Sequence, residues 1–544
     1  MARRSRLAPS RSFATSLATS FAASLLASVF FLPLDVRSAP AADGPLVVAR
    51  AMDVNSLDPA RAYCDTCQIY LSAVYATLLT LAPDNQTIIP MLAKSWEVSP
   101  DVTTFTFHLD PAATFSDGSP VTAQDVKWSL ERLKNIKGGP AYLMDSLKSI
   151  EAKDPATVVI TTETPNSEFL GILAAPYTGI INAKLAAANG ANANADAATS
   201  DASDTWFLAH SAGAGPFVLE SYTADDALRL ARNDKYWGKK PGVPGVVLKQ
   251  TADAVTQAQM LQSGTADIAM QIDPDTAKTV SVPDATFKSV PSFNFVYAAI
   301  SPAAKGAPVP LTSDVRQAIA LALDYKGAID FTVGGEGKEQ SSAIPNGYPG
   351  TKDLPAPVTN VEKAKELLAK AGHPDGFAME LEFPAMNVYG VDLSLLAQKV
   401  QQDLGKVGIK LSLKPVPFTV WISDINDPGT PFALGFFAPD YFGSAQYVQY
   451  FGMLPDMPWA NRAGVGKQPG LDGKEQLALY HKALAATDVP AQEAAYRDLA
   501  LKMIDDKIIL PLVSPNLILA YRNDVSGVRY SACCNLPLGE IEKK

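Results

Sequence analysis

Hydrophobic and polar positions change their period within residues 95–133. Over residues 104–109, TFTFHL, apolar and polar side chains alternate, which is typical of a half-buried strand. The cluster SDGSP at residues 116–120 indicates a tight turn. Thr122 and Asp125 then have the spacing of a helix capping box, and three apolar residues behind them share one helical face: Val126, Leu130 and Leu133. This stretch predicts a strand, a turn and a capped helix.

The same patterns predict further elements before residue 300. Leu46–Val48 is typical of a short strand, and a helix is expected through residues 70–79. Residues 157–162 are β-rich, and the segment GAGPFVL at 213–219 places two glycines before a strand, where they allow a bend and close backbone contact. The Ala-, Asn-, Asp- and Ser-rich stretch at 184–204 is expected to be a loop or a marginal helix.

Beyond residue 300, predicted helices alternate with strands. Val315–Ile329 is expected to form one amphipathic helix, capped by Ser313 or Asp314. Asn360 is expected to cap a helix at 361–371. The remaining elements are helices at 393–407, 475–487 and 491–505 and strands at 409–413, 508–513 and 517–521. A helix followed by a strand is the order of an α/β lobe.

The first 41 residues have the features of a secretory signal peptide. Four arginines lie within the first eleven positions, an Ala- and Ser-rich apolar run follows, and APA at 39–41 matches a small-x-small cleavage site. A membrane anchor is the alternative, but Ala and Ser dilute the run, and Pro33 and Asp35 close it. No cysteine lies at the cleavage site, so we expect a protein exported to a Gram-negative periplasm without a lipid anchor.

Length and charge narrow the classes of function. The 544-residue chain has a formal net charge of −10, and residues 1–41 contribute +4, so the remainder carries −14. Such an acidic protein is not expected to bind nucleic acid or an anionic membrane. About 500 residues exceed one ordinary hydrophobic core, so we expect two or three lobes.

Several segments of the chain resemble one known family. The stretch at 95–133, SWEVSPDVTTFTFHLDPAATFSDGSPVTAQDVKWSLERL, resembles a signature of the family 5 extracellular solute-binding proteins. Further segments resemble the same family in the same order: LDPA at 57–60, YATLLT at 75–80, GAGPFVL at 213–219, LRLARNDKYW at 228–237, GTADI at 264–268 and VRQAIALALDYKGAI at 315–329. One segment would be weak evidence, whereas this ordered series covers nearly all of the chain after the leader.

The resemblance implies the α/β fold of the large, three-lobe periplasmic binding proteins of type II. Two α/β lobes would hinge about paired crossovers, one of them near Ser292–Tyr297, and an extra β-rich lobe would enlarge one of them. The implied boundaries are a signal peptide at 1–41, lobe I at 42–82, 186–293 and 506–544, the extra lobe II at 83–185, and lobe III at 294–505.

The resemblance also implies a function. Members are periplasmic receptors of ABC importers, which capture a peptide-like ligand between two lobes and deliver it to permease subunits in the membrane. We therefore expect a monomeric protein, soluble rather than membrane-embedded, that needs no cofactor. The alternative is the same fold with a non-peptide ligand, such as an opine, an oligosaccharide or a metal complex.

The segment FFAPDYFGSAQY at 436–447 resembles the family block whose aspartate pairs with the ligand's α-ammonium group, which implies this role for Asp440. A charge-assisted hydrogen bond of this kind contributes ~1.5–3 kcal/mol. Gly443 and Ser444 replace the second Asp-Pro of the block, so strict dipeptide specificity is not implied. Aromatic residues nearby could stack on a ligand or pack the lobe. The expected ligand-binding residues are Asp440, Tyr441, Trp421, Phe437, Ser342 and Tyr447.

Sequence motifs of catalysis are absent. The chain contains neither a GxSxG nucleophile elbow nor an HExxH pair, and its GK dipeptides lack the rest of a P-loop. The four histidines are far apart in sequence and are not expected to hold a metal: His108, His210, His373 and His481. We therefore expect no catalytic residues, no metal ligands and no enzymatic activity, with a secreted hydrolase as the less favoured alternative.

The four cysteines form two close pairs, Cys64 with Cys67 and Cys533 with Cys534. Export to the periplasm favours disulfides. Adjacent Cα atoms lie ~3.8 Å apart, below the usual ~4.4–6.8 Å of a disulfide, so a bridge between Cys533 and Cys534 would be strained. A cross-link between the two pairs would avoid this strain and would require the start and the end of the chain to meet, which the family's fold provides. The pairing stays open at this point.

Overall fold

The computed structural model describes residues 44–424 and 429–544. The expected signal peptide at 1–41 lies outside the described residues. The chain divides into two units, Met1–Ala41 and Ala42–Lys544, and the structure below is that of the second unit. In the described ranges no helix is both long and apolar enough to cross a membrane.

A mixed sheet of seven strands contains the first strand of the described chain. Its strands are β1 Leu46–Arg50, β8 Phe217–Thr223, β9 Ala227–Arg232, β10 Gly245–Gln250, β11 Ile268–Ala269, β12 Ala285–Val290 and β21 Leu517–Arg522. Their order is β12-β21-β11-β1-β10-β9-β8, with β1 parallel to both of its neighbours. Two helices accompany this sheet, α7 Ala254–Ser263 and α8 Pro274–Thr279. The expected strand at Leu46–Val48 is confirmed as part of β1.

A second sheet of six strands has helices on both of its faces. Its strands are β13 Phe295–Ile300, β14 Gly337–Lys338, β15 Ala378–Pro384, β18 Lys410–Val416, β19 Phe432–Phe437 and β20 Ile509–Pro515, in the order β14-β20-β13-β19-β15-β18. The helices on one side are α9 Ser313–Ala322, α10 Tyr325–Val333, α11 Val361–Lys370 and α12 Leu393–Gly405. The others are α13 Phe418–Asp424, α14 Ala445–Phe451, α15 Pro458–Ala463, α16 Lys474–Ala485 and α17 Val489–Asp506.

The central strand β13 explains why helices pack on both faces of this sheet. All six of its residues are buried. Alternate side chains of a strand point to opposite faces. Val296, Ala298 and Ile300 accordingly pack in the core that contains α9–α12, whereas the intervening residues pack in a separate aromatic core with α14, α15 and α17. A helix-covered sheet of this kind confirms the expected α/β class.

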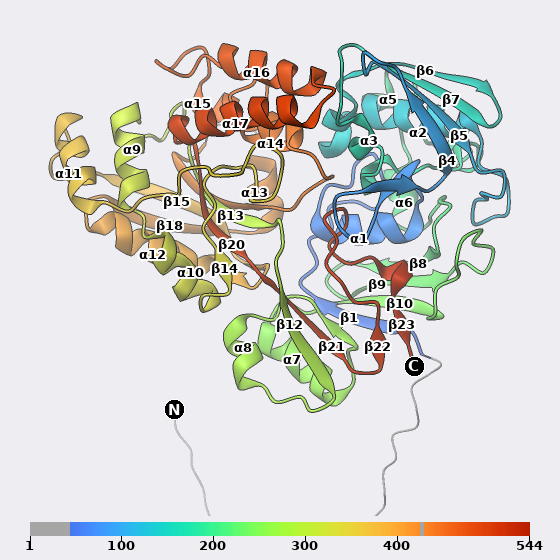
Figure 1. Cartoon of the computed structure of the whole chain (residues 1–544). Coiled ribbons are helices and arrows are strands. Elements are labelled where there is room, and N and C mark those ends of the chain that lie inside the picture. The colour runs from blue at the N-terminus through green and yellow to red at the C-terminus, as the bar shows by residue number, and fades with distance from the viewer. Residues whose placement is uncertain (1–43, 425–428) are drawn as a thin grey trace, which may run out of the picture. The chain divides into compact units, whose positions relative to one another are not determined.

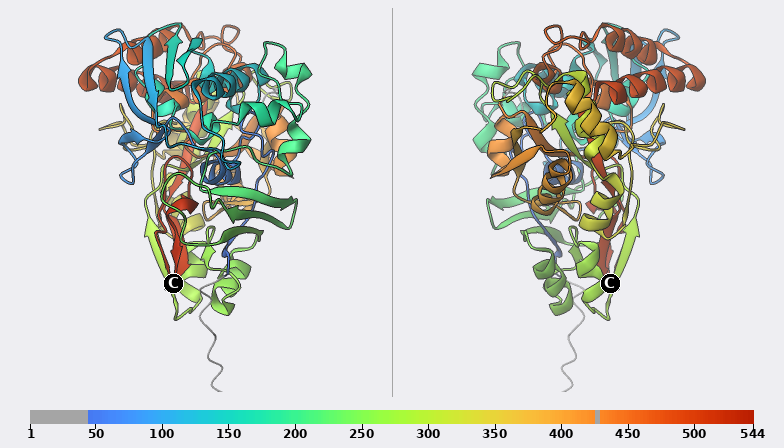
Figure 2. Two further views of the ribbon diagram at one scale, coloured as in Figure 1. Left: turned by 90° about the vertical axis from the view of Figure 1, so that its right-hand side faces the viewer. Right: turned by 90° about the vertical axis from the view of Figure 1, so that its left-hand side faces the viewer.

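The chain crosses twice between the two large sheets. It leaves β12 at Val290 and enters β13 at Phe295, and it returns from β20 to β21 through Asn516. The two crossings lie side by side, because the hydroxyl of Ser292 donates a hydrogen bond to the carbonyl oxygen of Pro515 at 2.8 Å. Figures 1 and 2 show these neighbouring strands in yellow-green and red. The crossover expected near Ser292–Tyr297 is confirmed.

The β-rich region contains a four-stranded antiparallel sheet. Its order is β4-β5-β7-β6, formed by β4 Ala93–Val98, β5 Thr104–Leu109, β6 Leu147–Asp154 and β7 Thr157–Thr162. The helix α2, Ala123–Ile136, packs against β6 and β7 (Figure 1). Thr122 and Asp125 form the expected capping box of α2, with both side chains bonded to the partner's backbone N–H. The strand, turn and capped helix predicted for 95–133 are confirmed.

Short elements connect these sheets. The helices and turns are α1 Asp65–Val74, η1 Gly139–Met144, α3 Phe169–Ile172, η2 Pro176–Thr178, α4 Ala183–Ala187, α5 Ala197–Ser200, α6 Asp204–Phe207 and η3 Leu538–Glu540. Two-stranded pairs are formed by β2 Leu79–Leu81 with β3 Ile88–Pro90, β16 Asn387–Val388 with β17 Val391–Asp392, and β22 Val525–Ser526 with β23 Glu542–Lys543. The loop or marginal helix expected at 184–204 corresponds to α4, α5 and the turns between them.

A buried ion-pair network joins segments that are distant in sequence. Arg132 of α2 is fully buried and donates two hydrogen bonds to the carboxylate of Asp58, each 2.6 Å long. Its Nε also donates to Asp201 at 2.9 Å. Burial opposes ionisation of Asp201, but the Arg132 guanidinium holds the pKa of that carboxyl well below its usual range. Asp58 and Arg132 therefore connect the LDPA segment to α2.

Two expected helices have different bounds in the structure. The helix expected at 70–79 is α1, which ends at Val74. The carbonyl oxygen of Val74 accepts the backbone N–H of Gly215 at 3.0 Å, and a Cβ on Gly213 would lie 2.0 Å from the same oxygen. Backbone of a distant segment therefore occupies the place where the helix would continue, as the paired glycines allow.

The single helix expected at 315–329 is two helices, α9 and α10. Asp324 separates them, because its side chain accepts the N–H of Gly327 at 2.9 Å and so caps α10. The cap of α9 is Thr312, one residue before the positions expected from the sequence. The helix predicted at 361–371 is confirmed as α11, with Asn360 as its cap.

The disulfide joins Cys64 to Cys67, whose Cα atoms are 4.9 Å apart. The two residues lie one turn apart at the start of α1, where Cys64 is the cap, so their separation falls in the range that a disulfide requires. Cys533 and Cys534 are buried free thiols. The start and the end of the described chain do meet, since Asn535 donates to the side chain of Gln68 at 3.3 Å. The cross-link considered between the two pairs is nevertheless wrong, because Cys64 is bonded within its own turn.

Candidate functional site

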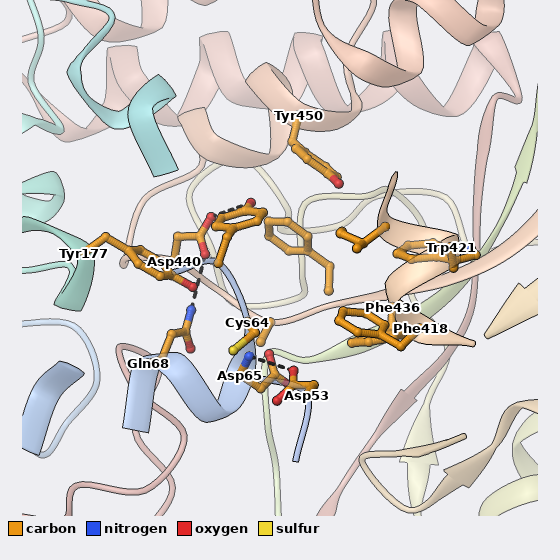
Figure 3. A pocket seen from close by; sticks show the side chains of 14 residues that line it. Asp53, Cys64, Asp65, Gln68, Tyr177, Phe418, Trp421, Phe436, Asp440 and Tyr450 are labelled. Atoms are coloured by element: carbon orange, nitrogen blue, oxygen red, sulfur yellow. Dashed lines mark hydrogen bonds between the residues drawn. The ribbon is translucent and has the colours of Figure 1, made fainter. Parts of the chain in front are cut away.

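A cavity lies where the start of α1 approaches α13, α14 and the end of β19. It encloses about 450 Å³ of space, part of it open to solvent. In the view of Figure 3, Asp440 and Tyr177 are on one side and the rings of Phe418, Trp421 and Phe436 on the other. The lining residues are Asp53, Tyr63, Cys64, Asp65, Gln68, Tyr177, Phe418, Trp421, Ile422, Phe436, Phe437, Ala438, Asp440 and Tyr450.

Asp440 is the most deeply placed carboxylate of this cavity, with 3% of its surface exposed. It follows β19, and its backbone N–H donates to the side chain of Gln446 at 2.7 Å. Its carboxylate accepts hydrogen bonds from the hydroxyls of Tyr63, at 3.0 Å, and Tyr142, and from the amide of Gln68 at 3.2 Å. Burial raises the pKa of Asp440 to about 6, although these donors act in the opposite direction.

The carboxylates of Asp53 and Asp65 form the acidic side of the cavity at the start of α1. Asp53 accepts the backbone N–H groups of Asp65 and Thr66 at 2.9 Å each, which satisfies donors that the helix leaves unpaired. It also forms a 3.7 Å ion pair with Arg50. Burial and the neighbouring charge of Asp53 raise the pKa of Asp65 to about 7. Asp53 is therefore satisfied by hydrogen bonds and an ion pair within the protein, whereas Asp65 lies near the negative charge of Asp53.

Stacked aromatic rings form the opposite wall. The ring of Trp421 is nearly parallel to those of Phe418 and Phe436, with centroids 6.3 and 6.0 Å away. Gly435 makes room for this stack, because a Cβ there would lie 2.8 Å from Trp421 and 2.6 Å from the hydroxyl of Tyr297. Such a wall offers flat apolar faces to a ligand and favours a cation held against them.

The structure brings together three of the six expected binding residues, Asp440, Trp421 and Phe437, along this cavity. Tyr441, Ser342 and Tyr447 do not line it. The hydroxyl of Tyr441 donates to buried Glu168 at 3.2 Å, that of Ser342 donates to the carbonyl oxygen of Ile344 at 3.1 Å, and Tyr447 lies within the aromatic core.

Sequence reasoning missed the half of the cavity that comes from residues 53–68. Asp53, Asp65 and Gln68 surround the start of α1, and Tyr63 precedes them. Tyr177 lines the cavity from the short turn η2, and Tyr142, which donates a hydrogen bond to Asp440, comes from η1. One signal was present in the sequence: Asp65 lies between the two cysteines of the CxxC segment, where a helix begins. Nothing local in the sequence indicates that these residues face Asp440.

The protein has two sheet-based lobes joined by paired crossings, an added β-rich region and a cavity at the junction of the lobes. These features are those of the three-lobe solute-binding proteins of type II. Residues 87–455 match the model of the bacterial extracellular solute-binding proteins, family 5, middle region. The chain belongs to this family.

Similar proteins extend over nearly the whole chain. The probable D,D-dipeptide-binding periplasmic protein DdpA of Escherichia coli K12 is 28% identical over 528 residues, which cover 93% of this chain and 96% of that protein. The peptide transport periplasmic protein SapA of Salmonella typhimurium is 25% identical over 553 residues, covering 94% of each. The structure of AgaA from A. tumefaciens R10 with agropinic acid superimposes with a TM-score of 0.78 at 25% identity, covering 92% of this chain and 99% of AgaA. DppA from Helicobacter pylori, in complex with the peptide STSA, gives a TM-score of 0.79 at 22% identity, covering 92% and 98%.

Proposed function

We propose that the protein is a periplasmic receptor of an ABC importer, exported by its first 41 residues. It captures a peptide-like ligand by its amine between lobes I and III, which have the boundaries expected above, and delivers it to permease subunits as a monomer. Membership of the solute-binding family and the names of the relatives support this function. The observation that carries it is the buried carboxylate of Asp440 at the cavity.

The contacts of Asp440 suit an ammonium group. The carboxylate lies after β19 of one lobe and accepts hydrogen bonds from Tyr63 and Gln68, which come from the segment around α1. A ligand ammonium bound at this place therefore contacts residues of both lobes and favours the closed arrangement over an open one. A charge-assisted hydrogen bond here contributes ~1.5–3 kcal/mol, which corresponds to a factor of about ten or more in affinity.

The test uses the chain from Ala42 onward and calorimetric titration with ligands selected by thermal shift. The panel contains di- and oligopeptides, opines, oligosaccharides and metal complexes. Asp440→Asn is expected to weaken the binding of an amine-bearing ligand at least tenfold, because the amide keeps the shape but loses the charge. Asp375→Asn, at an exposed loop position, is the matched control and should bind like the natural protein.

Two results would contradict the proposal. Unchanged affinity of Asp440→Asn for a verified peptide would remove this residue from the binding site. Binding of sugars or opines alone would leave the receptor function but refute the amine anchor. Mass spectrometry of the recovered ligand separates binding from turnover, and an altered ligand would favour the hydrolase alternative.

A further inference from the structure

The charges that line the cavity are all of one sign. Three carboxylates face it, and among the described residues no lysine, arginine or histidine lines it. Arg50, a cation that adjoins this lining, is buried, pairs with Asp53 and donates to the carbonyl oxygen of Ala51 at 3.2 Å. A ligand carboxylate placed in this cavity would therefore meet like charges without a cationic partner, at a cost that low polarity increases.

The three carboxylates differ in how far the protein already satisfies them. Asp440 accepts hydrogen bonds from two tyrosines and a glutamine, and Asp53 accepts two helix N–H groups and pairs with Arg50. Asp65 donates its backbone N–H to Asp53, but its carboxylate forms no ion pair with any residue in the described part of the chain. One carboxylate of the cavity therefore has no ion-pair partner in contact with it, and the charge of Arg50 acts on it only from farther away.

An independent observation points to the same place. Tyr389 lies in the two-residue loop between β16 and β17, with a φ of 55°, which is unusual for a bulky residue. The residue is 7% exposed, and its hydroxyl faces the carboxylate of Asp65 without a hydrogen bond of full geometry. Burial and the nearby charge of Asp65 raise the pKa of this hydroxyl. Tyr389 and Asp65 thus form a buried polar pair in which the carboxylate has no ion-pair partner, and a ligand cation would supply one.

The aromatic wall adjoins this pair. The ring of Phe436 stacks on Trp421 and also meets the ring of Tyr389 edge to face, with centroids 5.8 Å apart. In the view of Figure 3, Phe418 and Phe436 lie to the right of Asp53 and Asp65, and Asp440 lies to their upper left. A cation near Asp65 would thus lie against aromatic faces, which attract it further.

We propose that the ligand carries two cationic groups, one bound at Asp440 and the second at Asp65 with Tyr389 and the aromatic wall. The substrate class is then that of basic amines without a free carboxylate at the site: diamines, guanidino-amines and amides of basic amino acids. This inference rests on the proposed function and names its substrate class. It agrees with the raised pKa of Asp65, since burial and, to a smaller extent, the charge of Asp53 oppose its ionisation, and a bound cation would favour it.

Three matched probes test the inference by calorimetry on the chain from Ala42 onward. Lysinamide has two cationic groups, norleucinamide lacks the second one at nearly the same size, and lysine adds a carboxylate. Lysinamide is expected to bind at least tenfold more tightly than norleucinamide, and lysine to bind more weakly than lysinamide. Equal affinities for lysinamide and norleucinamide, or no binding of lysinamide, would overturn the inference.

Variants locate the second charge. Asp65→Asn should abolish the preference for lysinamide over norleucinamide, and Tyr389→Phe should reduce the same preference. Asp440→Asn should weaken both probes equally. A preference that survives in Asp65→Asn would refute the assignment to this residue. If Asp65→Asn does not fold, the comparison of lysinamide with norleucinamide on the natural protein still tests whether the ligand carries a second cationic group. Failure of lysinamide with success of other amine-bearing ligands refutes only this inference, whereas loss of every amine-bearing ligand refutes the proposed function as well.

Discussion

The affinity for a ligand with one ammonium group is expected to fall as the pH drops from 7 to 5. Burial raises the pKa of Asp440 to about 6 in the empty protein. The empty folded protein therefore holds a proton at pH 5 that the ammonium group must displace. Roughly nine tenths of Asp440 is ionised at pH 7 and roughly one tenth at pH 5, so affinity falls about tenfold, or ~1.4 kcal/mol. A ligand α-ammonium group, with a pKa of ~7.7–8.0, stays charged throughout this window.

Calorimetry at pH 5, 6 and 7 measures this effect. Because the pKa of Asp65 is also raised, the titration is made in the Asp65→Asn protein, where the remaining slope belongs to Asp440. Two buffers with different enthalpies of ionisation report the proton released on binding, which should approach one at pH 5 and fall toward zero at pH 7. A flat profile in this variant would refute the reasoning, and so would an equally steep profile after adding Asp440→Asn.

Two further outcomes follow from buried groups outside the cavity. Arg132→Met should lower the free energy of unfolding by about 3–5 kcal/mol, because it leaves the carboxylates of Asp58 and Asp201 buried without their main partner. Thermal unfolding measures this effect, with Lys365→Met on an exposed helical face as the control. Equal unfolding midpoints for the two variants would contradict the prediction. Iodoacetamide should modify Cys533 and Cys534 only after unfolding, since both are buried thiols and the other two cysteines form a disulfide. Mass spectrometry counts the modified thiols. Modification of the native protein, or none after unfolding, would contradict this prediction.

Elements that depend on neighbouring residues could be predicted from the sequence. The capping box of α2 needs only Thr122 and Asp125, and α11 needs only the cap at Asn360. The break between α9 and α10 could not be predicted in this way. The backbone N–H of Asp324 donates to Asp403 at 3.1 Å, 79 positions away in sequence. This distant contact holds Asp324 where its side chain caps α10, and the apolar periodicity within 315–329 does not record it.

The candidate site was predictable on one side only. Asp440 and Trp421 lie in or near a segment whose sequence resembles a known family block, so the resemblance predicted them as ligand-binding residues. Gln68 reaches Asp440 across 372 positions. From the sequence alone, Asp65 has the features of an acidic residue in the first turn of a helix, and Tyr389 those of a turn residue beside Gly390. Only the folded chain shows that the carboxylate of Asp65 and the buried hydroxyl of Tyr389 lie together.

The acidic lining also connects ligand charge to lobe closure. A ligand can shift the equilibrium between open and closed forms only by the difference in its affinity for the two. Asp53, Asp65 and Asp440 line one cavity, and burial there raises the pKa values of Asp65 and Asp440, with the charge of Asp53 adding to the effect at Asp65. A cationic ligand that contacts both lobes offsets the cost of burying these carboxylates, whereas a ligand carboxylate would increase it. The same residues would thus select the ligand and decide whether the lobes stay closed around it.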